Sequence, residues 1–208
     1  MTQRASNPKD RPCIIISGLG RCGSSLVMQM LHAGGVECLG APPAFEPPES
    51  SSMCLTRDWM RGQAGKAFKL IDPQLSRVAF EGERAVVVLL QRDVKQQAAS
   101  MAKFGELVAG LSYGRSERRR LAASFERDLP KARAKFATLP TLLLSFERLI
   151  LEPAIAARML GSALHPYGFQ LDEVLAASVV RARSPDCYPG LLEAQLVEER
   201  RMDGTEVL

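Results

Sequence analysis

The sequence predicts an α/β fold in which a parallel β-sheet forms the middle of three layers, flanked by helices. Continuous apolar runs at 13–17 and 85–91 have the length and β-branched composition of strands that are buried on both faces. Segments of helical periodicity, such as 24–33 and 94–108, follow these runs. Because alternating strands and helices build parallel sheets covered on both faces, this pattern predicts the three-layer class.

The other elements complete the alternation. Four prolines and a run of serines make residues 40–52 a loop, and loops of this length in a compact domain are often functional. The ligands of such sheets lie beyond the carboxyl ends of the strands, so the residues there are the candidates for a site. The expected strands are 13–17, 36–39, 66–71, 85–91 and 141–145, and the expected helices are 24–33, 53–63, 94–108, 116–136, 153–165 and 171–180.

Length and composition indicate one globular domain over residues 1–208, with a disordered or loose N-terminus over about 1–11. Apolar residues make up 46% and charged residues 24% of the chain, which excludes a disordered or fibrous class. The apolar runs are far below the ~20 residues of a membrane span. The polar N-terminus and five cysteines without a CxxC pair favour a cytoplasmic protein with reduced thiols.

The net charge of +4 has one local concentration, in the segment 115–120, which carries four arginines. A solvent-exposed helix face explains this segment most simply. Nucleic-acid binding requires a more basic domain with stacking aromatics, and aromatics are only 6% of this chain. We therefore expect no nucleic-acid partner.

The turn between the first strand and the first helix carries the main functional signal. Gly18, Gly20 and Gly23 are followed by two hydroxyl residues, Ser24 and Ser25, which open the helix. Glycines let backbone amides approach an anion, and a helix N-terminus adds unpaired N–H groups and a favourable dipole. This is the pattern of a phosphate-binding turn.

Two common phosphate motifs fit the turn imperfectly. The three glycines satisfy the GxGxxG pattern of dinucleotide-dependent oxidoreductases, but no acidic residue ends the second expected strand to hold a ribose. Gly18 and Gly23 also have Walker A spacing, and Ser25 fits the Ser or Thr of that motif. Ser24, however, stands where the motif needs its lysine. Ordinary nucleoside triphosphate hydrolysis is therefore disfavoured.

The turn resembles the 5′-phosphosulfate loop of the P-loop sulfotransferases, in which a basic residue stands before the second glycine. The matching segment reads Gly18-Leu19-Gly20-Arg21-Cys22-Gly23-Ser24-Ser25. Gly20 replaces the usual proline and Cys22 the usual serine. Gly20 makes the loop more flexible, and a thiol is a weaker hydrogen-bond donor than a hydroxyl.

A second motif matches the same family. Arg92 directly follows the strand at 85–91, and Ser100 lies eight residues later. In the family, an arginine and a serine at this spacing bind the 3′-phosphate of the donor. Less specific similarities link the strand around Lys69 and the segment 144–149 to the family. The resemblance covers about residues 13–165 and implies a P-loop NTPase-like sulfotransferase fold.

The resemblance implies transfer of a sulfuryl group from 3′-phosphoadenosine 5′-phosphosulfate (PAPS) to a hydroxyl or amine, with 3′-phosphoadenosine 5′-phosphate (PAP) as product and no metal. The acceptor would be a small molecule or a carbohydrate, and the oligomeric state is open. Arg21, Glu46 and Lys69 are the expected catalytic residues. The expected donor-binding residues are Gly20, Arg21, Cys22, Gly23, Ser24, Ser25, Arg92 and Ser100.

The general base has two candidates. Ile71 occupies the position where the family's cytosolic branch has a histidine, whereas Glu46 lies in surroundings like those of the glutamate base in carbohydrate and tyrosine sulfotransferases. Asp72, at the end of a strand, is the second candidate. Two further hypotheses stay open: a nucleotide-binding relative that has lost catalysis, and the dinucleotide-dependent oxidoreductase.

Overall fold

The computed structural model describes residues 10–180, which fall into two compact units. The first unit holds residues 10–92 and 128–180, and the second holds residues 93–127. The single domain expected over the whole chain stays a prediction. Arg181 and Arg183, which resemble basic residues that related enzymes bring over the donor, lie outside the described residues, as does most of the N-terminus expected to be loose.

The first unit is built on a parallel sheet with the strand order β2-β1-β3-β4. Strand β1 lies in the middle and pairs Gly18 with Ile71 on one side and Ser17 with Leu89 on the other. Since all pairs are parallel, the four carboxyl ends meet at one edge of the sheet. The strands are β1 (Cys13–Gly18), β2 (Ala67–Ile71), β3 (Ala85–Gln91) and β4 (Thr141–Ser145).

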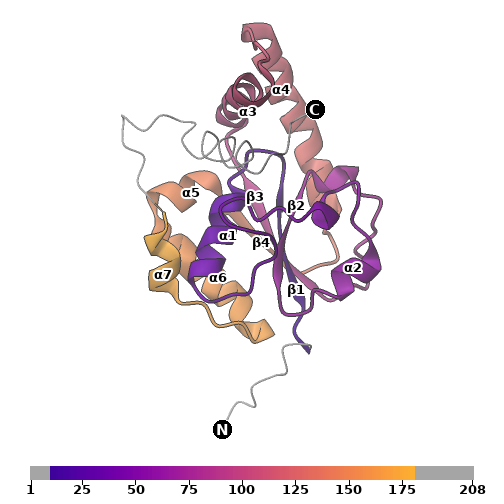
Figure 1. Ribbon diagram of the computed structural model, residues 1–208, viewed down its shortest axis with the longest axis vertical. Helices are drawn as coiled ribbons and strands as arrows, with labels where there is room; N and C mark the ends of the chain where they lie inside the picture. Colours follow the sequence, from indigo (N-terminus) through magenta and orange to yellow (C-terminus); the bar gives the residue numbers. More distant parts are fainter. Residues whose placement is uncertain (1–9, 181–208) are drawn as a thin grey trace. The chain divides into compact units, whose positions relative to one another are not determined.

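Helices cover both faces of this sheet, as the sequence predicts (Figure 1). One core contains Ile14, Ile16 and Val88 of the sheet together with the apolar sides of α1, α5, α6 and α7. The other contains Ile15 and Val87 with Met60 of α2. The helices of this unit are α1 (Ser24–Ala33), α2 (Arg57–Arg61), α5 (Phe146–Leu151), α6 (Pro153–Leu164) and α7 (Glu173–Ser178).

The predicted bounds of α1, β3 and β4 are confirmed, and two other predictions are wrong. The segment 36–39 is not a strand, because its only ladder contact is a single parallel bridge between Cys38 and Ala67. The helix expected at 53–63 is limited to the five residues of α2, since Thr56 caps its start and Gly62 its end. Helix α5 was not predicted, although Ser145 caps it by accepting the Arg148 N–H at 3.2 Å.

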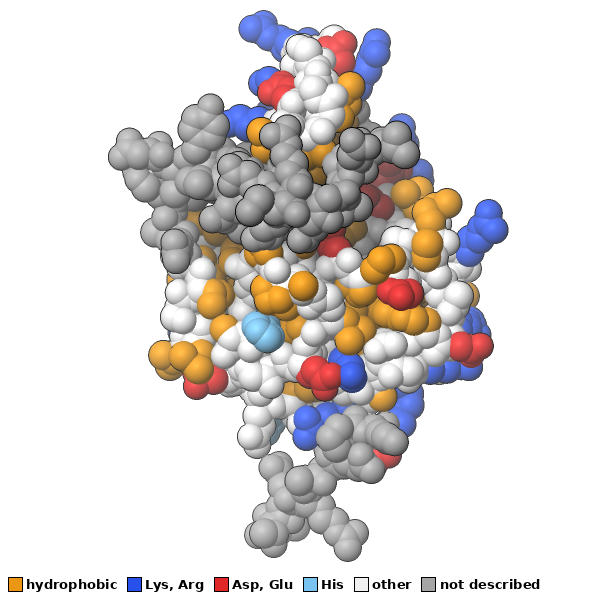
Figure 2. Space-filling view, viewed as in Figure 1, with side chains coloured by type: hydrophobic (Ala, Val, Ile, Leu, Met, Phe, Trp, Pro, Cys, Tyr) orange, Lys and Arg blue, Asp and Glu red, His pale blue; other side chains and the backbone are white. Residues whose placement is uncertain are grey.

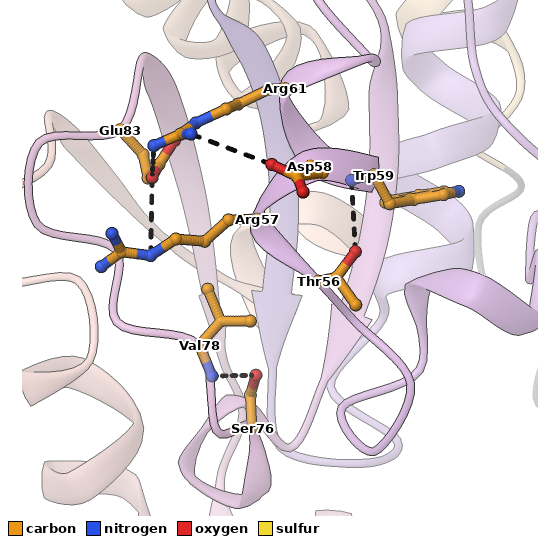
Figure 3. A network of polar contacts seen from close by, with 8 residues as sticks. All are labelled: Thr56, Arg57, Asp58, Trp59, Arg61, Ser76, Val78 and Glu83. Carbon is orange, nitrogen blue, oxygen red and sulfur yellow. Dashed lines mark hydrogen bonds and ion pairs between the residues drawn. The ribbon is translucent and has the colours of Figure 1, made fainter.

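An ion-pair network around one buried carboxylate stabilises the edge of the sheet opposite the carboxyl ends (Figure 3). The side chain of Glu83 is only 3% exposed, yet it lies just before β3 with its charge balanced by arginines of α2. Arg61 donates two hydrogen bonds to it, at 2.9 and 2.8 Å, and Arg57 adds a longer contact at 3.6 Å. The forked pair joins α2 to the strand edge and compensates the burial of the carboxylate.

The second unit consists of α3 (Val94–Ala109) and the first part of α4 (Arg115–Ala134). Arg118 of α4 pairs with Glu106 of α3 at 3.4 Å, and the arginines of the segment 115–120 are exposed. Figure 2 shows Lys and Arg side chains projecting from the part of the chain that Figure 1 labels α3 and α4. The predicted solvent-exposed basic face is therefore confirmed.

None of the helices within residues 10–180 combines the length and apolar character of a membrane span.

Candidate active site

The loop between β1 and α1 reaches the carboxyl edge of the sheet, where the sequence predicts a phosphate-binding turn. Gly23 is the N-cap of α1 at φ 99°, no side chain caps the helix, and its first turn contains no acidic residue. A Cβ on Gly23 would lie 2.5 Å from the ring of Phe146, so only glycine fits between the loop and α5. The first turn of α1 thus retains the amides and the dipole that attract an anion.

Arg21 lies at the top of this loop in a left-handed conformation, with φ 68°. For a residue other than glycine this conformation costs about 1 kcal/mol, so neighbouring contacts must hold it. Its carbonyl oxygen accepts a hydrogen bond from Nη1 of Arg92 at 3.1 Å. Burial lowers the pKa of the Arg21 guanidinium, and the charge of Glu46 opposes this shift.

Lys69 is a buried cation that points toward the loop from β2. Phe68 and Leu70 face the core on the other side of the sheet, so the strand's alternation turns Lys69 toward α1. Its Nζ donates to Ser25 Oγ at 3.0 Å, to the carbonyl of Ala44 at 2.6 Å and to Glu46 Oε1 at 2.5 Å. Burial lowers the pKa of Lys69, while Glu46 favours its charged form.

Glu46 reaches the site because the loop before it is anchored. Phe45 is 1% exposed, has φ 54°, and its ring lies 5.5 Å from the ring of His32 on α1. The carbonyl of Pro43 accepts a hydrogen bond from Gln29 Nε2 at 3.2 Å. The side chain of Glu46 remains 50% exposed beside the buried ammonium. The carboxylate therefore contacts Lys69 through Oε1, and its exposed part is accessible to a molecule that arrives from solvent.

Arg92 follows β3 and joins the loop to α5. Its guanidinium carbon lies 4.1 Å from the centre of the Phe146 ring, over its face. This is the geometry of a cation–π contact, which orients the flat guanidinium. Because the same side chain donates to Arg21, the arginine of the second predicted motif lies directly beside the first motif.

Neither the known protein-family models nor the curated protein sequences gave a match to this chain. Solved structures do resemble it. Mouse sulfotransferase SULT7A1, complexed with PAP, is 12% identical over 86% of this chain and 70% of that chain, with a TM-score of 0.55. Sulfotransferase STF1 from Mycobacterium tuberculosis H37Rv is 15% identical over 91% of this chain and 76% of that chain, with a TM-score of 0.56.

The chain has the sulfotransferase fold. The fold predicted from the glycine turn and the strand-end arginine is therefore confirmed. Within this sulfotransferase fold, the predicted residues Arg21, Ser25, Glu46, Lys69 and Arg92 lie together at the carboxyl edge of the sheet.

Two further predicted donor-binding residues are Cys22 and Ser100. Cys22 is 0% exposed, with its thiol packed in the core below the loop, and burial raises its pKa to about 11. Its backbone amide, rather than its thiol, is the group that can contribute to a site in the loop. Ser100 lies on α3, in the second compact unit, so its place beside Arg92 stays a prediction.

The structure shows contacts of Phe146 and Asp72 in the site that the sequence did not predict. Phe146 supplies the ring against Gly23 and Arg92, and its only sequence signal was its place directly after a strand. Asp72 was expected as a possible base, whereas its Oδ1 accepts the backbone N–H of Gly20 at 3.2 Å. No local pattern reports this contact, because the two residues are 52 positions apart.

Proposed function

We propose that this protein is a sulfotransferase that transfers a sulfuryl group from PAPS to a hydroxyl or amine acceptor. The observation that carries the proposal is the convergence of Lys69 and Ser25 at the start of α1, where a buried ammonium donates to a hydroxyl of the phosphate-binding turn. A cation in this position would stabilise an anionic ligand, such as a phosphosulfate, bound at the turn. The sulfotransferase fold supports the proposal.

The donor set suits a phosphosulfate. The amides of residues 22–25 and the hydroxyls of Ser24 and Ser25 would hold the 5′-phosphate, and Arg92 would bind the 3′-phosphate. Arg21 would stabilise the charge that develops on the bridging oxygen, and Lys69 the charge on the sulfuryl oxygens. These roles need no metal.

The transfer step requires a base for the acceptor, and Glu46 has the better placement of the two candidates. The acceptor oxygen or nitrogen attacks sulfur, the bond from sulfur to the bridging phosphate oxygen breaks, PAP leaves, and the acceptor proton passes to Glu46. The half-exposed carboxylate of Glu46 is accessible from solvent, whereas Asp72 accepts a hydrogen bond from the loop backbone. The acceptor would be a small molecule or a carbohydrate.

A cytoplasmic location is part of this proposal. Cys13, Cys22, Cys38 and Cys54, the cysteines within residues 10–180, are all free thiols, as expected in a reducing compartment.

Within the same residues Glu37, the acid closest to the place where a dinucleotide fold needs one, pairs with Lys66 at 2.6 Å. This pairing makes the oxidoreductase hypothesis the weaker one.

Calorimetric titration tests the nucleotide preference. PAP should bind at least about tenfold more tightly than 5′-AMP, which differs from it by lacking the 3′-phosphate, because a guanidinium–phosphate contact is charge-assisted. Arg92→Ala should remove most of this preference, and Arg77→Ala, at an exposed arginine, should leave it unchanged. Equal or tighter binding of ATP or NAD would contradict the proposal.

Transfer from ³⁵S-labelled PAPS to a panel of phenols, sterols, amines and sugars tests the reaction itself. A labelled product that is lost in Glu46→Gln, with PAP affinity unchanged, would support Glu46 as the base. Selective PAP binding without any labelled product would instead support the relative that has lost catalysis.

A further inference from the structure

Asp72 makes two hydrogen bonds to the phosphate-binding turn from the end of β2. Its Oδ1 accepts the N–H of Gly20 at 3.2 Å, and its own N–H donates to the carbonyl of Gly18 at 2.9 Å. The parallel register explains the contact, because Ile71 lies opposite Gly18 and Asp72 is the next residue of the chain. Asp72 itself has a left-handed conformation, with φ 53°.

The opposite flank of the turn is held from β3. Arg92 donates to the carbonyl of Arg21 at 3.1 Å, one residue beyond the amide that Asp72 accepts. The Leu19–Gly20 and Arg21–Cys22 peptide groups, which flank the Gly20–Arg21 peptide, are thus held by side chains that follow the strands on either side of β1. Arg21, one of the two residues between these peptide groups, has a left-handed backbone, with φ 68°.

The charge of Asp72 makes this contact informative. A carboxylate beside an anion-binding turn repels the ligand. Burial raises the pKa of Asp72, whereas the hydrogen bond from the Gly20 N–H favours its charged form. An acid in this position therefore weakens anion binding through its charge. Its hydrogen bonds to the turn are the contribution that can offset this effect.

We propose that Asp72 is a positioning residue that holds the Gly18–Arg21 turn in the shape that binds an anion. The inference rests on the proposed function for the identity of that anion, the 5′-phosphosulfate group of the donor. A turn that is already ordered loses less conformational entropy when the ligand binds. Asp72 acts through the backbone of Gly20 and not as a proton acceptor in the transfer step.

The comparison of Asp72→Asn with Asp72→Ala separates positioning from base catalysis. Asparagine keeps an oxygen that accepts the Gly20 N–H and removes the charge, whereas alanine removes both. PAP should bind Asp72→Asn within about threefold of the original affinity or more tightly, and Asp72→Ala about tenfold more weakly. If Asp72 were instead the base, both variants would lose transfer equally while keeping PAP affinity, and this result would overturn the inference.

Hydrogen exchange of the Gly20 amide, followed by NMR in the ligand-free protein, tests the contact without any nucleotide. The amide should exchange about tenfold faster in Asp72→Ala than in the original protein, and Asp72→Asn should retain the protection. Unchanged exchange in Asp72→Ala overturns the inference, whether or not PAP binds. Protected exchange in a protein that fails to bind PAP would overturn the proposed function and retain the role of Asp72 in the turn.

Asp72→Ser serves as a second variant if Asp72→Ala does not fold. Its shorter hydroxyl keeps an acceptor near the turn, and Gly20 exchange should then lie between the values for the original protein and for unprotected amides. Exchange as slow as in the original protein, together with weak PAP binding, would count against the positioning role.

Discussion

The Nζ of Lys69 lies 2.5 Å from Oε1 of Glu46, and the two residues differ sharply in their access to water. The side chain of Lys69 is 2% exposed, whereas that of Glu46 is 50% exposed. The buried cation is therefore fixed by the fold, while the carboxylate can exchange its partner for solvent or for an acceptor. This asymmetry fits a site in which Lys69 faces the donor and Glu46 faces the acceptor.

Replacing Lys69 should affect transfer far more than stability. Lys69→Met should lower kcat/KM for sulfuryl transfer about 100-fold, because it removes a preorganised positive charge. Urea unfolding should change by only about 1 kcal/mol, since the buried ammonium is itself unfavourable and the released Glu46 is solvated. Lys66→Met, which removes the ion pair with Glu37 just before the same strand, is the matched control and should leave transfer unchanged.

Gly23→Ala should destabilise the protein more than alanine at another left-handed glycine. Gly23 and Gly35 have φ 99° and 90°, but a Cβ on Gly23 would meet Phe146 at 2.5 Å whereas one on Gly35 meets nothing within 4 Å. Both variants lose about 1 kcal/mol to backbone strain. The clash should add a further ~1–3 kcal/mol in Gly23→Ala, measured by urea unfolding. Equal losses in the two variants would mean that Phe146 does not pack against the loop.

The raised pKa of Asp72 predicts how stability depends on pH. Because the folded state holds this proton more tightly than the unfolded chain, whose carboxyl has a pKa near 3.8, stability should fall as the pH rises through the interval between the two values. Asp72→Asn cannot ionise and should gain stability relative to the original protein over that interval. A constant difference from pH 3 to pH 7 would contradict the burial of Asp72.

Alkylation of the folded protein should distinguish the thiols. Cys54 is exposed, whereas Cys22 is fully buried with a pKa raised to about 11, so its reactive thiolate is scarce at neutral pH. Iodoacetamide should modify Cys54 first and reach Cys22 only on unfolding, as followed by peptide mass spectrometry in a Cys187→Ser background. Rapid modification of Cys22 in the native protein would show that its thiol faces the site.

The network around Glu83 predicts unequal effects for two arginines of α2. Arg61 makes the forked pair at 2.8 and 2.9 Å, and Arg57 makes a single contact at 3.6 Å. Arg61→Met should therefore lower the urea midpoint more than Arg57→Met, because it leaves the buried carboxylate with the weaker partner. A larger decrease for Arg57→Met would contradict this arrangement.

Local sequence patterns were sufficient for the elements that carry the phosphate-binding turn. The apolar run of β1, the glycines and the periodicity of α1 are short-range signals, and the observed helix begins and ends at the predicted residues. The prediction of a strand at 36–39 was wrong because a strand also needs a paired neighbour along its length. In this segment only Cys38 pairs with β2. The apolar character of a short segment does not contain that information.

The sequence by itself determined the sheet class, the turn and the set of polar residues at the strand ends. Tertiary structure alone decided which of them meet: Lys69 with Ser25 and Glu46, Asp72 with Gly20, and Arg92 with Phe146. The physical reason is the parallel register, in which Ile71 lies opposite Gly18 and the side chains of β2 alternate between the two cores. A shift of one residue would turn Lys69 away from α1 and move Asp72 from the turn.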